Sequence, residues 1–297
     1  MALPTATTAA AVRVPSPDRP AEPRHEIWYR HRIRVRLALA DLWRSRELIT
    51  TLAERDLRVR YKQALLGFAW VLITPVLLMV VFTFVFTKFT QIETGGVPYP
   101  LFVYVALIPW TFFSNSLNSG GMGLVSNMAI VNRVYCPREV FPVAAMIVAA
   151  VDAAVSGLVL AVLFVVEGYA PKVEALYFPV LLLVLIAFTL GVTLAISSAL
   201  VYLRDLRHAL PLLVQLMLFA TPVAYGMNVL AKTREQVLVY SALNPLAPVI
   251  DGFRRTILYG TAPDWQALGV GAMSSVLFLC FGFWLFKRLE TGIADIA

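Results

Sequence analysis

Long stretches without a charged residue are the feature that most restricts how this chain can fold. Residues 64–87 and 94–132 contain no Asp, Glu, Lys or Arg, 140–166 contains only Asp152, and 175–203 is again uncharged. A helix needs about 20 predominantly apolar residues to cross the hydrocarbon core of a bilayer. Charged residues make up 14% of the chain, whereas soluble domains carry about 25%. The sequence therefore predicts an all-α integral membrane protein.

The uncharged stretches predict how often the chain crosses the membrane. We expect six transmembrane helices, at about residues 64–87, 100–120, 140–166, 176–203, 209–230 and 265–286. Six crossings put both termini on one side. If that side is the cytoplasm, the inside segments hold 19 Lys or Arg and the outside segments hold 6, which is a clear positive-inside bias. We therefore expect both termini to be cytoplasmic.

The chain before the first span is basic. Thirteen Lys or Arg and seven Asp or Glu precede Leu65, and positive charge beside a membrane favours anionic lipid over nucleic acid as its partner. Residues 1–25 have the composition of a disordered cytoplasmic tail. Residues 26–62 predict an amphipathic helix at the membrane interface, although 31–37 alternates and could equally be extended. The transmembrane domain is expected over 63–297.

One apolar segment is too short and too broken for a span. Residues 236–250 are uncharged but contain Asn244 and Pro245. We expect a re-entrant helical hairpin over 236–259 on the external side, with a plain extracellular loop as the alternative. Irregular backbone at membrane depth survives where protein or a water-filled cavity covers it. We therefore predict an external gate that includes Asn244, Pro245 and Arg254.

Motifs for catalysis are missing from the sequence. No phosphate-binding GxxxxGK[ST] motif occurs, and we expect no catalytic residue, no metal site and no cofactor in this chain. Cys136 and Cys280 fit neither a metal spacing nor a disulfide framework. Asp152 is the only acidic residue well inside a predicted span. We expect it to make a polar contact with Ser156 or a neighbouring helix, with glycan contact as the alternative.

Four segments, in this order, together resemble the ABC-2 type permeases that export polysaccharides, the Wzm and teichoic-acid transporter group. They are ERDLRVRYKQALLGFAWVLITP at 54–75, NMAIVNRVYCPREVFP at 127–142, YLRDLRHALPLLVQLMLFATPVAY at 202–225 and LNPLAPVIDGFRRTILY at 243–259. The resemblance covers most of the chain from about residue 40 onward.

The resemblance implies a permease subunit in the cytoplasmic membrane of a bacterium. Such a subunit forms a homodimer, binds two copies of an ABC ATPase that carries ATP and Mg²⁺, and exports a polyprenyl-diphosphate-linked polysaccharide of the O-antigen, galactan or teichoic-acid type. An exporter of drugs or small lipids from the same superfamily is the first alternative. An ion-coupled secondary transporter is the second alternative.

The resemblance also assigns roles to residues. A cytoplasmic coupling helix within 126–139 docks into the ATPase, which makes Arg133, Tyr135, Pro137, Arg138 and Glu139 the expected interface. The basic interface helix is placed to attract the lipid diphosphate through Arg55, Arg58, Arg60 and Lys62. Spans one and five line the channel in this family, so the aromatic channel candidates are Trp70, Phe82, Phe219 and Tyr225.

Overall fold

The computed structural model describes residues 35–62, 69–90, 94–131, 133, 136–203 and 205–296. Every regular element in these ranges is helical, as the uncharged stretches predict. Five helical segments are long and apolar enough to cross a membrane: Ala69–Lys88, Tyr99–Ser126, Val140–Val166, Val173–Tyr202 and Trp265–Glu290. The expected tail at 1–25 and the start of span one at 64–68 lie outside the described residues.

The first two helices precede the membrane-spanning bundle. Helix α1 covers Val35–Arg44 and α2 covers Arg46–Lys62. The apolar side of α2 packs against the bundle, because Ile49, Leu52 and Ala53 are buried there. The predicted interface helix is thus packed on the protein, and its polar residues are held at fixed positions against the spans.

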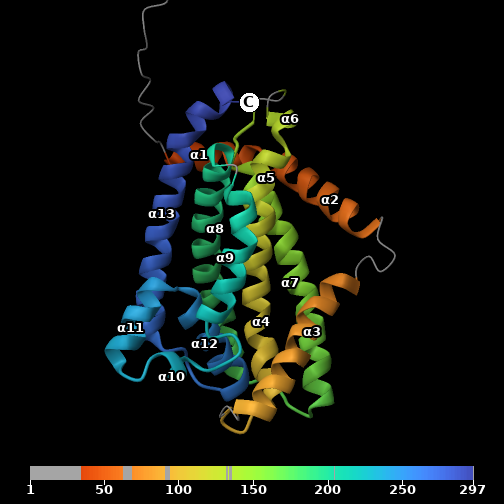
Figure 1. The fold of residues 1–297 in the computed structure, drawn as a ribbon, viewed down its shortest axis with the longest axis vertical. Helices are drawn as coiled ribbons and strands as arrows, with labels where there is room; N and C mark the ends of the chain where they lie inside the picture. Colours follow the sequence, from red (N-terminus) through yellow and green to blue (C-terminus); the bar gives the residue numbers. More distant parts are fainter. Residues whose placement is uncertain are drawn as a thin grey trace, which may run out of the picture. The chain divides into compact units, whose positions relative to one another are not determined.

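The first two spans each contain an irregular turn. Helix α3 covers Ala69–Val85 and continues into the π-helical turn η1, Phe86–Thr90. Helix α4 covers Tyr99–Asn115, and it continues through the π-helical turn η2, Ser116–Gly120, into α5, Gly121–Ser126. Most of α4 is buried among its neighbours, so it forms the centre of the bundle (Figure 1).

The remaining long helices are α7 and α8, which contact α4, and α13, which packs on α8. Helix α6 covers Met128–Val131, and α7 covers Val140–Val166, a length of about 40 Å at 1.5 Å per residue. The short 3-10 turn η3, Val173–Tyr177, leads into α8, Phe178–Tyr202. The last helix, α13, covers Trp265–Ile296 and runs beside α8.

Two glycines let α8 and α13 approach closely. A Cβ atom added to Gly282 would lie 1.9 Å from the carbonyl oxygen of Gly191, and one added to Gly191 would lie 2.6 Å from the backbone of α13. Such a contact is possible only without side chains. Small residues at a crossing point are the usual means of packing helices in a bilayer, where apolar side chains gain little by leaving lipid.

The span predicted at 209–230 is not one unbroken helix. Helix α9 covers Leu206–Ala220, and Thr221 is extended with a ψ of 138°. The residue before a proline disfavours the α conformation, and Pro222 follows Thr221 directly. The chain resumes as α10, Met227–Leu230. At 15 residues α9 is about 22 Å long, which is shorter than a hydrocarbon core of about 30 Å.

The segment predicted as a helical hairpin does form two helices with a break between them. Helix α11 covers Arg234–Leu243, with a capping box at Thr233 and Gln236, and α12 covers Leu246–Arg254 before the π-helical turn η4, Arg255–Tyr259. Asn244 and Pro245 occupy the break. Helices α10, α11 and α12 gather at one end of the bundle, while α1, α6 and the end of α13 lie at the other (Figure 1).

Candidate functional site

Asp152, in the middle of α7, is paired with the end of α2. Its carboxylate accepts a hydrogen bond from the Arg60 guanidinium at 2.5 Å and another from the Tyr61 hydroxyl at 2.5 Å. Burial, followed by the hydrogen bond to Asp152, raises the pKa of Tyr61, so this hydroxyl keeps its proton. Ser156 donates to the Asp152 backbone carbonyl instead of its carboxylate. The polar contact expected of Asp152 is therefore made with α2.

A cavity of about 300 Å³ opens beside this ion pair, between α2, α3, α4 and α7. Asp152 and Arg60 form part of its wall, together with Trp70 from α3 and Ser114 from α4. Arg60 also borders a second cavity of about 340 Å³, which Arg55 lines. Two partly polar cavities thus share Arg60 as a wall residue.

The other basic residues of α2 have different surroundings. Arg55 donates to Asp56 at 2.7 Å and to the Asn127 side chain at 2.8 Å, which ties α2 to the loop after α5. Arg58 is exposed and pairs with Glu54 at 3.3 Å. The Lys62 side chain lies outside the described residues. The structure therefore brings Arg55 and Arg60 to the cavities and leaves Arg58 outside.

The loop predicted to be the coupling element contains one short helix, α6. Arg133 is exposed, Pro137 and Arg138 are half-buried, and Tyr135 lies outside the described residues. Arg138 donates a hydrogen bond to the backbone carbonyl of Glu290 near the end of α13. The loop is thus anchored on the last helix.

Glu139 has a partner within the chain. It is buried and forms an ion pair with Lys287 of α13, which also contacts Glu290 at 2.9 Å. Sequence reasoning counted Lys287 among the positive charges on the inner side and did not connect it to Glu139. The signal that could have suggested the pair was an acidic residue at the start of one predicted span and a basic residue at the end of another, both on the side predicted to be cytoplasmic.

The four aromatic channel candidates do not share one environment. Trp70 and Phe219 are 55% and 59% exposed, and both lie on the outside of the bundle. Phe82 is 7% exposed and packs edge-on against the Phe86 ring, with the two centroids 6.0 Å apart. Tyr225 is half-buried and donates its hydroxyl hydrogen to the Phe219 carbonyl. Only Trp70 among them borders the polar cavity beside Asp152.

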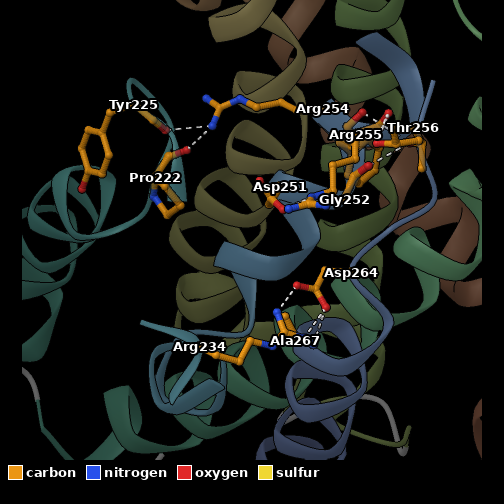
Figure 2. A network of polar contacts seen from close by, with 12 residues as sticks. Pro222, Tyr225, Arg234, Asp251, Gly252, Arg254, Arg255, Thr256, Asp264 and Ala267 are labelled. Atoms are coloured by element: carbon orange, nitrogen blue, oxygen red, sulfur yellow. Dashed lines mark hydrogen bonds and ion pairs between the residues drawn. The ribbon is translucent and has the colours of Figure 1, made fainter. Parts of the chain in front are cut away.

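Arg254, one of the expected gate residues, is held rigidly. Its side chain is 1% exposed and donates to the backbone carbonyls of Phe102 at 3.1 Å, Pro222 at 2.8 Å and Tyr225 at 2.8 Å, and also to that of Val223. Figure 2 shows the guanidinium reaching from α12 to Pro222 and Tyr225.

The surroundings of Arg254 explain how a charge can be buried there. The guanidinium carbon lies 3.7 Å from the centre of the Phe102 ring. A buried charge is tolerated when hydrogen bonds and a cation–π contact replace its hydration. The arginine therefore fastens α12 to α4 and to the chain break that follows α9.

The other two expected gate residues lie in the same region. Asn244 is buried and donates to the Thr221 hydroxyl at 2.9 Å, while its side-chain oxygen accepts from the Leu246 amide at 3.2 Å. Pro245 faces Gly271 of α13, because a Cβ on that glycine would meet Pro245 and Pro248. The break between α11 and α12 is thus hydrogen-bonded, through Asn244, to Thr221 at the break after α9.

A salt bridge that sequence reasoning missed closes the hairpin onto α13. Arg234 donates to Asp264 at 2.8 Å and to Gln266 at 2.7 Å, and the pair is visible in Figure 2. The hydrogen bond from Arg234 lowers the pKa of Asp264 to about 2. Asp264 therefore stays ionised at any physiological pH.

A larger cavity of about 530 Å³ lies between α4, α7, α8 and α12 and differs in character from the two polar ones. Its walls are apolar and include Ala150, Ala154 and Gly157 from α7 and Leu182 from α8. Hydrocarbon, and not sugar, is the chemistry that suits it.

Comparison with known proteins places the chain among transporters. Residues 47–258 match the family described as "ABC-2 type transporter". The "O-antigen export system permease protein RfbA" of Myxococcus xanthus is 30% identical over 86% of this chain and 97% of its own length. A protein of the same name from Klebsiella pneumoniae is 24% identical over 84% of this chain and 95% of its own. The "Polysialic acid transport protein KpsM" of Escherichia coli is 21% identical over 80% and 91%. With its membrane-spanning helices and a match that covers more than half its length, the chain belongs to the ABC-2 type transporter family.

Proposed function

We propose that this chain is the transmembrane permease subunit of an ABC transporter that exports polysaccharide linked to a polyprenyl diphosphate. The observation that carries the proposal is its similarity to O-antigen and polysialic acid export proteins over 80–86% of its length. The substrate is a glycan of the O-antigen, galactan or teichoic-acid type. Export takes it across the cytoplasmic membrane.

ATP and Mg²⁺ bind to a separate ATPase subunit in this proposal. The membrane domain must then receive force through a short element that projects from the bundle and is firmly joined to the spans. The segment from α6 to Glu139 meets both conditions, since Arg133 is exposed while Arg138 and Glu139 are fastened to α13. Arg133 contacts the ATPase, and Glu139 transmits the movement to the last helix.

Two copies of the chain form the channel, and two ATPase subunits bind them. Exposed apolar side chains on α3 and α9 support this arrangement, including Leu77, Phe84, Leu216 and Phe219. Helices α3 and α9 correspond to spans one and five, which line the channel in the permease family that the sequence resembles. The pathway then lies between two α3 and α9 surfaces.

The proposed topology has six crossings and two cytoplasmic termini. Helix α9 makes the fifth crossing together with the irregular residues after Thr221. Two observations support it: α1 and the C-terminal end of α13 lie at the same end of the bundle, and α9 runs alongside α8 (Figure 1). The hairpin of α11 and α12 enters the external leaflet.

Depletion of the chain in its own cell tests the proposed function. A lipid-linked glycan is expected to accumulate on the cytoplasmic side and to disappear from the surface, as mass spectrometry of extracted lipids would show. Normal glycan export combined with increased sensitivity to drugs would instead identify an exporter of small molecules. Export that continues without ATP but stops with the proton gradient would refute the ABC mechanism.

The basic residues of α2 can be tested in the same cells. Replacing Arg55, Arg58, Arg60 and Lys62 with Gln is expected to reduce export while assembly with the ATPase remains intact. Because Arg58 lies away from the cavities, Arg58→Gln alone is the matched control and should retain most export. Unchanged export by the fourfold variant would rule out a role for this helix in attracting the diphosphate.

A further inference from the structure

The cavity beside Asp152 combines features that lipid packing does not require. Asp152 is 3% exposed and lies near the middle of the long helix α7. An ionised group at this depth is costly and usually marks a functional site. Here the charge is paired with Arg60 and borders a cavity whose wall is partly polar and partly apolar.

The hydroxyl groups of the cavity can accept hydrogen bonds but have no proton left to donate. Thr74, Thr111, Ser114 and Ser156 each donate to a carbonyl three or four residues earlier in their own helix, at 3.0–3.2 Å. A hydroxyl has one proton and two lone pairs. These hydroxyls and the Asp152 carboxylate offer acceptors, while the side-chain amide of Asn115 offers donors and an acceptor. A suitable ligand brings both hydrogen-bond donors and acceptors.

The guanidinium of Arg60 favours a different chemical group in the ligand. The Arg60 side chain is 37% exposed although it is paired with Asp152, and Arg60 is one of the residues that line the cavity. A guanidinium binds phosphate oxygens well because its planar donors match them in geometry. A bare phosphate brings acceptors only, so it suits Arg60 but not the wall hydroxyls or the Asp152 carboxylate.

We propose that this cavity binds the sugar residue adjoining the lipid diphosphate, with the diphosphate at Arg60 and the sugar hydroxyls donating to Asp152 and Thr111. A sugar has many hydroxyl groups and an apolar ring face, and Trp70 is one of the wall residues. A volume of about 300 Å³ is at the small end of the range for ligand pockets, which suits one end of the glycan. This proposal rests on the proposed function and specifies where that substrate is first held.

Binding to the full-length chain in lipid nanodiscs tests the proposal with two probes. One probe is undecaprenyl diphosphate carrying a single N-acetylglucosamine, and the other is undecaprenyl diphosphate alone. The wild-type chain is expected to bind the first about tenfold more tightly than the second. Asp152→Asn should lower the affinity for the sugar-bearing probe about tenfold, and Thr111→Val should lower it about threefold. Neither variant should change the affinity for undecaprenyl diphosphate alone. Arg60→Gln should weaken both probes alike.

Asp251→Asn is the matched control, because Asp251 also pairs with an arginine, Arg255, at 2.6 Å but lies on α12. It should bind both probes as the wild type does. Thr111→Val leaves the ion pair untouched, so it remains informative if Asp152→Asn does not fold.

Three results would overturn the proposal. If the wild type binds both probes equally, or if Asp152→Asn weakens both by the same factor, no sugar is held at Asp152, although the exporter assignment stands. If the wild type binds neither probe and depletion causes no glycan to accumulate, the proposed function itself has failed.

Discussion

Lys287 near the end of α13 forms an ion pair with Glu139 at the beginning of α7, although the two residues are 148 positions apart in the sequence. Glu139 is buried, and Lys287 also contacts Glu290. The pair joins the segment that we propose to contact the ATPase to the last helix. Any movement of this segment relative to α13 must strain or break it.

The strength of this pair can be measured with a double-mutant cycle of Glu139→Gln and Lys287→Gln. Because Glu139 is shielded from water, we expect a coupling free energy of about 1–3 kcal/mol. Thermal unfolding in detergent supplies the values. The exposed pair of Glu54 and Arg58 is the control and should give less than about 1 kcal/mol. Equal coupling in both cycles would contradict a special role for Glu139.

Gly282→Ala is expected to destabilise the bundle. The added Cβ would meet the Gly191 carbonyl oxygen at 1.9 Å, so α8 and α13 must separate, at a cost of about 1–3 kcal/mol or more. The control is Gly269→Ala in the same helix, where a Cβ meets nothing within 4 Å. It should be neutral or stabilise the helix by up to about 1 kcal/mol. Equal melting temperatures for the two variants would show that the crossing is looser than described.

Arg254→Lys is expected to weaken the end of the bundle where α10, α11 and α12 gather, although it preserves the charge. A lysine ammonium is a compact charge and cannot reach the four carbonyls that the arginine fork contacts. We expect a loss of at least about 2 kcal/mol in stability. Arg255→Lys, at the half-exposed neighbouring position, should change stability by less than about 1 kcal/mol. Similar melting curves for both variants would argue against the fastening role of Arg254.

The salt bridge of Arg234 and Asp264 predicts a specific pH dependence. The pKa of Asp264 falls from 3.8 to about 2 in the folded chain, so its contribution to stability is complete above about pH 4 and is lost as the pH falls through about 2. The difference in melting temperature between the wild type and Asp264→Asn should therefore stay constant from about pH 8 to pH 5 and shrink below about pH 4. A difference that already disappears near pH 6 would contradict this assignment.

The sequence by itself determined the class of fold and most of the spans. Residues 140–166 were predicted as a span and form α7 with those bounds, and the hairpin broken at Asn244 and Pro245 was also expected. These features are local. A bilayer demands length and apolarity from each helix separately, and both can be read from one stretch of chain.

Only the tertiary structure decided how the polar residues are used. The Arg60 partner lies 92 positions away at Asp152, and Glu139 faces Lys287 and not open solvent. The sequence did not predict that α9 ends at Ala220. The apolar stretch favoured a helix that continues past Pro222, and this proline was the only local indication of a break there. Contacts between distant residues depend on how helices rotate and pack against one another. Hydropathy and charge patterns carry no information about that rotation, because every face of a membrane-spanning helix can be apolar.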